Sequence, residues 1–186
     1  MNKNLIYITL IILLIFPNYS QTKENIMILK LKDGDVKIKL FPEDAPKHVE
    51  RIKKLANEGK YNDVVFHRVI DGFMAQTGDV MYGNSSSNKF DLNKAGMGGS
   101  ELPDLKAEFN DLPHQRGTVS MARANDPNSA NSQFFICFKE ASFLDRNYTV
   151  FGKVIEGMEF VDNIKRGDGA NGMVSNPDKI ISFKSE

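Results

Sequence analysis

The sequence predicts a mainly β fold, an antiparallel barrel or sandwich with two helices. Three observations support this prediction: alternating apolar and charged residues at 25–43, several short β-branched or aromatic runs after residue 63, and only two segments with helical periodicity. Alternation with a period of two is typical of strands with one buried face. Many short strands with few helices favour an antiparallel arrangement over alternating strands and helices.

The first hairpin is the clearest local signal. Apolar and charged residues alternate on both sides of Asp33 and Gly34 in the stretch NIMILKLKDGDVKIKLFPE, residues 25–43. An Asp-Gly pair between two alternating runs favours a tight turn. We therefore expect two antiparallel strands joined at this pair.

The next stretch, DAPKHVERIKKLANEGK (residues 44–60), changes to helical periodicity. Asp44 can cap the helix, Pro46 suits its first turn because no amide proton is needed there, and Gly59 can end it. The apolar side chains that share one face are Val49, Ile52, Leu55 and Ala56. This pattern predicts one amphipathic helix.

Short apolar runs separated by Gly, Asn, Asp and Pro clusters follow the helix. They read VVFHRVI, FMAQ, GTVSMA, SQFFICF, YTVFGKVI and KIISFK, and each is typical of a short strand. A second helix is expected over residues 157–166, because Met158, Val161 and Ile164 recur every three positions. Residues 80–108 are rich in Ser, Asn and Gly and predict a long exposed loop.

Composition excludes several classes of protein. The 186 residues suit one domain, and 41% hydrophobic with 26% charged residues is typical of a globular protein. Equal numbers of basic and acidic residues, 24 each, give no reason to expect nucleic acid or an anionic membrane as a partner. With a single cysteine, Cys137, and three dispersed histidines, the sequence indicates no intrachain disulfide, no metal site and no cofactor.

Residues 1–20 differ in kind from the rest. Lys3 is followed by an apolar run at 5–16 and then by Pro, Asn, Tyr and Ser, a pattern typical of a secretory signal. A run of about twelve residues is too short for a stable membrane span, which needs about 20. We expect cleavage after Ser20 and a mature domain at residues 21–186 in the periplasm or outside the cell. An uncleaved membrane anchor is the alternative.

Four longer stretches resemble cyclophilin-type peptidyl-prolyl cis/trans isomerases of the bacterial exported type. They are FHRVIDGFMAQTGD (66–79), AEFN (107–110), HQRGTVSMARANDPNSANSQFFI (114–136) and FLDRNYTVFGKVIEGM (143–158). The resemblance covers about residues 26–183. It implies a closed eight-stranded antiparallel barrel capped by two α-helices, with a groove outside the barrel for proline-containing polypeptides. It also implies a monomer that assists protein folding.

The resemblance also implies roles for individual residues. Arg68 matches the catalytic arginine, and Gln76 matches the glutamine that orients it. The residues that match the proline pocket are Phe73, Met74, Phe135 and Leu144. Those that match the peptide groove are Ala122, Arg123, Ala124 and Gln133, with the backbone at Arg123 binding the substrate main chain. Phe143 and Tyr148 stand where many eukaryotic members have tryptophan and histidine, so we expect weak cyclosporin binding.

This chemistry explains why an arginine would stand among apolar residues. Rotation about an Xaa-Pro bond breaks amide resonance, with a barrier of about 20 kcal/mol. In the twisted state the proline nitrogen regains a lone pair, so a fixed N–H donor binds that state better than either planar isomer. Arg68 can be this donor, because it stays protonated and one edge can contact Gln76 while another N–H faces the substrate.

Other interpretations remain open at this point. Arg68 taken alone fits a snorkelling or ion-paired residue, and its apolar neighbours fit an ordinary core. His67 fits a structural residue better than an acid or base. A hydrolase triad could combine Ser120 or Ser132 with His67 or His114 and an aspartate, although no GxSxG motif accompanies them. A binding or chaperone module that uses the groove and the loop at 80–108 is the rival from another class.

Overall fold

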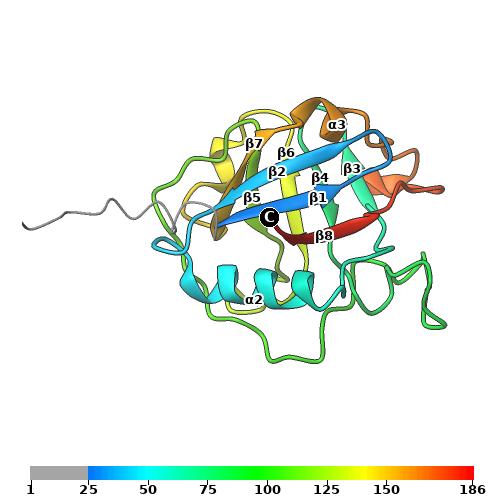
Figure 1. Ribbon diagram of the computed structural model, residues 1–186, viewed down its shortest axis with the longest axis horizontal. Helices are drawn as coiled ribbons and strands as arrows, with labels where there is room; N and C mark the ends of the chain where they lie inside the picture. The colour runs from blue at the N-terminus through cyan, green and yellow to red at the C-terminus, as the bar shows by residue number, and fades with distance from the viewer. Residues whose placement is uncertain (1–24) are drawn as a thin grey trace, which may run out of the picture.

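Eight antiparallel strands form one curled sheet in the computed structural model, which describes residues 25–186 (Figure 1). The strand order is β3-β4-β6-β5-β7-β2-β1-β8. The strands are β1 Ile26–Lys30, β2 Asp35–Leu40, β3 Arg68–Ile70, β4 Met74–Thr77, β5 Thr118–Met121, β6 Phe134–Cys137, β7 Val150–Glu156 and β8 Ser182–Ser185. The predicted signal at residues 1–20 lies outside the described residues. The mainly β class predicted from the sequence is confirmed.

The hairpin of β1 and β2 is confirmed at the predicted position. Ile26 pairs with Lys39 and Lys30 pairs with Asp35. The turn is closed by a hydrogen bond of 3.0 Å from the Leu31 amide to the Gly34 carbonyl. Alternate side chains of both strands point into the core, as the alternating pattern requires.

Helix α2, Pro46–Asn57, has the predicted buried face but a different cap. Asp44 does not cap it: the N-cap position is Ala45, and no side chain of the neighbouring segment bonds to the first turn. Instead the carboxylate of Glu108 accepts the backbone N–H groups of Lys47 and His48 at 3.1 Å. The unsatisfied amides of the helix N-terminus are thus bound by a residue that sequence proximity could not reveal.

The second helix, α3 Met158–Asp162, occupies the predicted place but is shorter than residues 157–166. The Lys165 amide donates to the Asp178 carboxylate at 2.8 Å, and the Gly167 amide donates to the Val69 carbonyl at 2.8 Å. These contacts take the backbone away from the helix. The side chain of Arg166 then binds the carbonyl of Asp162 that the helix leaves free, at 2.8 Å.

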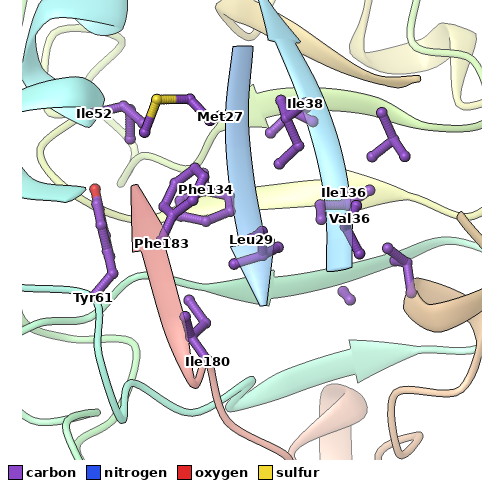
Figure 2. Close-up of a cluster of buried hydrophobic side chains, with 14 of the residues drawn as sticks. Met27, Leu29, Val36, Ile38, Ile52, Tyr61, Phe134, Ile136, Ile180 and Phe183 are labelled. Carbon is purple, nitrogen blue, oxygen red and sulfur yellow. The ribbon is translucent and has the colours of Figure 1, made fainter. Parts of the chain in front are cut away.

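The interior of the curled sheet holds the main hydrophobic core. Figure 2 shows side chains from β1, β2, α2, β6 and β8 converging there. The ring of Tyr61 meets Phe134 edge to face at 5.6 Å, and both rings contact Phe183. Such aromatic pairs stabilise a core beyond the area they bury.

Closure of the sheet into a complete barrel is not confirmed. The sheet ends at β3 on one side and β8 on the other. The segments that precede these two edge strands meet through an isolated bridge between Val65 and Lys179. Backbone hydrogen bonds of 2.8 to 2.9 Å join residues 63–66 to residues 178–180. β3 is only three residues long, so the two edges meet without forming a continuous ladder. Within residues 25–186 no helix is both long and apolar enough to cross a membrane.

Strand β6 is buried on both faces, and this places the candidate site. Phe134 and Ile136 point into the main core, whereas Phe135 and Cys137 belong to a second buried cluster. Because side chains alternate along a strand, this second cluster lies on the opposite, outer face of the sheet. Its other buried members are Met74, Ala141 and Leu144.

Candidate active site

Strand register brings the main candidate residues into one row. Arg68 of β3 is paired with Gln76 of β4, and Gln76 is paired with Phe135 of β6. Paired residues in adjacent antiparallel strands point to the same face. The sheet therefore presents the guanidinium, the amide and the aromatic ring side by side on its outer face.

These residues line a cavity of about 290 Å³. Its full lining is Arg68, Phe73, Met74, Gln76, Ala122, Arg123, Phe135, Phe143, Leu144 and Tyr148. The apolar side comes from β4, β6 and the short 3-10 helix at Ser142–Leu144. The remaining predicted residues, Ala124 and Gln133, line an adjoining cavity of about 160 Å³ that shares Gln76, Ala122 and Arg123 with the first. All twelve predicted residues thus border one continuous groove.

The guanidinium of Arg68 is held on two sides by uncharged acceptors. Its Nη1 donates to Gln76 Oε1 at 3.2 Å, its Nε to the Asn171 carbonyl at 3.0 Å, and its Nη2 to Asn171 Oδ1 at 3.4 Å. An arginine has five N–H groups. The second N–H on Nη1 meets only the weak thioether acceptor of Met74, at 4.0 Å from Nη1 to Sδ, and one N–H on Nη2 has no protein acceptor among residues 25–186. Within residues 25–186 no carboxylate forms an ion pair with Arg68, which argues against a structural salt bridge.

Burial lowers the pKa of the Arg68 guanidinium from its ordinary value, and nearby Tyr148 partly offsets this effect. An arginine starts from so high a pKa that it stays charged at physiological pH. The side chain is half-buried, so water screens its charge less than at an open surface. The groove therefore presents a permanent cation beside an apolar pocket.

Asn171 is a site residue that sequence reasoning missed. It lies in the 3-10 turn at Ala170–Gly172 and has a left-handed backbone, with φ of 56°. Asparagine tolerates this conformation better than most residues. The Asn-Gly pair indicates a turn in the sequence, but nothing local connects that turn to Arg68.

Arg123 shapes the groove wall instead of reaching into solvent. Its guanidinium donates to the carbonyls of Ala124, Asn125 and Asn147 at 2.9 to 3.2 Å. It also lies 4.6 Å from the centre of the Tyr148 ring. Four of its five N–H groups thus have carbonyl acceptors, which hold the guanidinium along the groove wall.

A Ser-His-Asp series does occur, but behind the pocket. His114 Nδ1 lies 2.9 Å from Asp145 Oδ1, and its Nε2 lies 3.0 Å from Ser120 Oγ. Ser120 and His114 are completely buried, and Ser120 Oγ also contacts the Thr149 carbonyl at 2.9 Å. The His114 ring stacks beside Phe135 at 6.1 Å. No substrate can reach Ser120 Oγ, so the series supports the pocket wall. Ser132 is completely buried as well, and its Oγ donates to the Gly78 carbonyl at 2.7 Å, so the hydrolase interpretation fails.

Two further groups considered from the sequence are also enclosed. Burial raises the pKa of the Cys137 thiol to about 12, so it is an inert thiol. His67 is buried next to β3, and neither of its ring nitrogens has a hydrogen-bond partner. It does not line the groove, in agreement with a structural residue.

Comparisons with known proteins agree with this fold and groove. Residues 26–185 match the family described as "Cyclophilin type peptidyl-prolyl cis-trans isomerase/CLD". A "Probable peptidyl-prolyl cis-trans isomerase" of Brucella suis is 62% identical over 164 residues, covering 88% of this chain and 83% of the relative. A "Peptidyl-prolyl cis-trans isomerase" of Helicobacter pylori is 40% identical, covering 80% of this chain and 86% of the relative.

Solved structures are similar as well. A cyclophilin from Hirschia baltica has a TM-score of 0.72 at 28% identity, covering 88% of this chain and 74% of that one. A cyclophilin-type isomerase from Cryptosporidium parvum, crystallised in the presence of the dipeptide Ala-Pro, has a TM-score of 0.72 at 28% identity, covering 87% and 98%. The class of protein is therefore a peptidyl-prolyl cis-trans isomerase. This chain belongs to the cyclophilin-type family of these enzymes.

Proposed function

We propose that the groove around Arg68 catalyses rotation of Xaa-Pro bonds in polypeptide substrates, and that the enzyme assists protein folding outside the cytoplasm. The observation that carries the catalytic part is that two Arg68 N–H groups beside the apolar pocket lack a strong protein acceptor: one has none, and the other meets only the Met74 sulfur. The proline ring enters this pocket, and the preceding carbonyl rotates at its edge.

The arginine acts on a charge distribution that exists only during rotation. The planar imide nitrogen is a poor acceptor, whereas the twisted nitrogen carries a lone pair. A donor fixed beside that nitrogen stabilises the twisted state more than either ground state. Gln76 and Asn171 hold the guanidinium still, so little reorganisation is needed when the lone pair appears.

The apolar pocket binds the proline ring and excludes water. Phe73, Met74 and Phe135 offer a surface that matches a proline ring, and Leu144 closes its side. An apolar environment also strengthens the contact between the guanidinium and the nitrogen by excluding water. The relative crystallised with Ala-Pro supports a proline-containing peptide as the ligand of this groove.

Replacement of Arg68 tests the catalytic part. An NMR exchange assay on a short Xaa-Pro peptide measures the catalysed isomerisation rate. Arg68→Ala should lower this rate by about a hundredfold or more, as expected for the removal of one transition-state donor. Arg146→Ala is the matched control, because Arg146 is an exposed arginine near the groove that pairs with Asp111 and lines neither cavity. Equal exchange rates for wild type and a folded Arg68→Ala variant would contradict the proposal.

The export part rests on the signal-like pattern at residues 1–20. We expect residues 1–24 to carry a fused alkaline phosphatase into the periplasm of a bacterial host, where that reporter is active. Replacement of two leucines in the apolar run by aspartate should keep the fusion in the cytoplasm. An inactive fusion with the intact run would contradict export.

A holding function for the long loop is the second candidate. A cavity of about 680 Å³ lies between the end of α2 and the loop, and it shares no residue with the groove. Its lining includes Lys54, Glu58, Lys60, Lys89 and Glu101. Replacing residues 84–93 with a short Gly-Ser linker leaves the groove intact. Loss of chaperone activity towards an unfolded protein without loss of peptide isomerisation would show that this loop holds clients.

A further inference from the structure

A series of amide hydrogen bonds connects the long loop to Arg68. The carbonyls of Gly96 and Gly98 accept hydrogen bonds from Gln133 Nε2 at 2.9 and 2.7 Å. Gln133 Oε1 accepts one from Gln76 Nε2 at 3.0 Å, and Gln76 Oε1 accepts one from Arg68 Nη1 at 3.2 Å. The loop is therefore coupled to the guanidinium through two side-chain amides.

Both ends of this series determine its direction. A carbonyl only accepts, so Gln133 must face the two glycine carbonyls with its Nε2. Its Oε1 then faces Gln76, which must present Nε2 to it and Oε1 to Arg68. If Gln76 were reversed, its N–H groups would face a guanidinium that only donates. The glycine carbonyls and Arg68 thus require the same orientation of the two amides.

The turn that carries these carbonyls is held by the carboxylate of Asp79. Its Oδ2 accepts the N–H groups of Gly96 at 2.8 Å and Gly98 at 2.9 Å, while its Oδ1 accepts those of Met81 at 3.0 Å and Tyr82 at 2.9 Å. Asp79 is completely buried. Hydrogen bonds to a carboxylate are stronger than neutral ones, and four of them fix the direction of the turn.

We propose that Asp79 is a positioning residue for the isomerase reaction: by fixing the Gly96 and Gly98 carbonyls it orients Gln133, then Gln76, and through them Arg68. Asp79 does not touch the substrate, since it lines neither cavity of the groove. A purely structural Asp79 would affect stability alone. A positioning Asp79 affects turnover per folded molecule.

The first test is Asp79→Asn, which keeps the shape but replaces one acceptor oxygen with an amide that cannot accept two N–H groups. The catalysed exchange rate at saturating peptide should fall at least about tenfold, because small displacements of a catalytic group are costly. Peptide affinity should change little, since the apolar pocket is untouched. Asp91→Asn is the matched control: it makes the same change in the same loop, at a residue whose carboxylate contacts Asn93 and Lys94 and neither glycine.

The second test leaves Asp79 intact and probes the next link, from the glycine carbonyls to Gln133, so the positioning series can be refuted even if Asp79→Asn fails to fold. Gln133→Glu places a carboxylate oxygen opposite the two glycine carbonyls. Arg123 lines the same cavity, and its charge offsets this repulsion only in part, since its guanidinium is held by other carbonyls. At pH 7.5 the variant should be slow, and acidification towards pH 5 should restore activity relative to wild type, because a protonated glutamic acid can donate again.

The two tests separate this inference from the catalytic assignment on which it rests. An inactive wild-type protein would overturn the assignment itself. An active wild type with unchanged turnover in folded Asp79→Asn, or with a Gln133→Glu pH profile parallel to that of wild type, would overturn only the positioning role. Lower turnover with unchanged peptide affinity, together with recovery in acid, establishes it.

Discussion

Asn171 holds Arg68 from a position 103 residues further along the chain, through a hydrogen bond of 3.0 Å from Arg68 Nε to the Asn171 carbonyl. The side-chain oxygen of Asn171 adds a weaker contact at 3.4 Å to Nη2. The main-chain contact depends on the left-handed backbone at Asn171, with φ of 56°. The orientation of the guanidinium thus depends on a turn from the far end of the chain.

Two substitutions at Asn171 separate these contacts. Asn171→Gly keeps the left-handed turn and the carbonyl and removes only the side-chain contact to Nη2. Isomerase activity should therefore fall only about twofold to fivefold, as expected for the loss of one weak hydrogen bond. Asn171→Val disfavours the left-handed backbone and should move the carbonyl, with a loss of about tenfold or more. Exchange rates at saturating peptide measure both effects. Equal losses in the two variants would contradict a main-chain role.

The sequence was sufficient for features that depend on local patterns. The hairpin at Asp33 and Gly34, the buried face of α2 and the run of short strands follow from periodicity and turn residues. The twelve groove residues were predicted from the motifs that carry the family resemblance. Strand register then brings Arg68, Gln76 and Phe135 side by side, and the other residues border the same two cavities.

Contacts between distant segments could not be predicted in this way. Three such contacts join residues separated by many positions. Glu108 caps α2, Asp178 binds the Lys165 amide just beyond the end of α3, and Asp79 anchors the loop. The loop at 80–108 looked merely irregular in sequence because its order comes largely from side chains such as the buried carboxylate of Asp79 and the amide of Asn131. Nothing in its composition identifies that carboxylate.

Phe143 determines the expected response to cyclosporin. Its ring is 70% exposed at the groove rim and lies 5.4 Å from the Phe73 ring. By the family resemblance, this is the position of a tryptophan, with its indole N–H donor, in many eukaryotic members. We expect weak binding by the wild type and about tenfold tighter binding by Phe143→Trp, the value of one added hydrogen bond. Phe109→Trp, at an exposed position outside the groove, controls for added aromatic surface. Calorimetric titration measures the affinities, and tight wild-type binding would contradict the expectation.

Glu108 should matter for stability and not for catalysis. Glu108→Ala removes the acceptor for two amides at the start of α2 and for His48 Nδ1 at 2.6 Å, so unfolding free energy should fall by about 2 kcal/mol. Glu43→Ala removes an exposed acid near the same helix end and should cost much less. Urea unfolding measures both. A large loss of turnover in folded Glu108→Ala would contradict this separation.

The Glu108 effect should also depend on pH. Burial opposes ionisation of this carboxyl, but the hydrogen bonds from His48 and from the backbone of Lys47 and His48 outweigh it, and its pKa is lowered. A lowered carboxyl pKa contributes stability that is present above its unfolded value and is lost as pH falls through the folded value. The stability difference between wild type and Glu108→Ala should therefore shrink below about pH 4.

His67 should make the fold sensitive to acid. Burial lowers its pKa from 6.5 to about 4, with the attraction of Asp79 only partly opposing this effect. Between these two values the unfolded chain binds a proton that the folded chain does not, so stability should fall as pH decreases from about 6.5 to about 4. The loss attributable to His67 is on the order of 3 kcal/mol.

Replacing His67 by leucine tests this acid sensitivity. His67→Leu removes two buried nitrogens that have no hydrogen-bond partner, so at pH 8 the variant should be at least as stable as wild type. Urea unfolding from pH 8 to pH 4.5 should then show a shallower loss of stability in the variant. His48 and His114, whose pKa values are also lowered by burial, remain in both proteins and account for the residual slope. Parallel stability curves for wild type and His67→Leu would place the acid sensitivity at those two histidines instead.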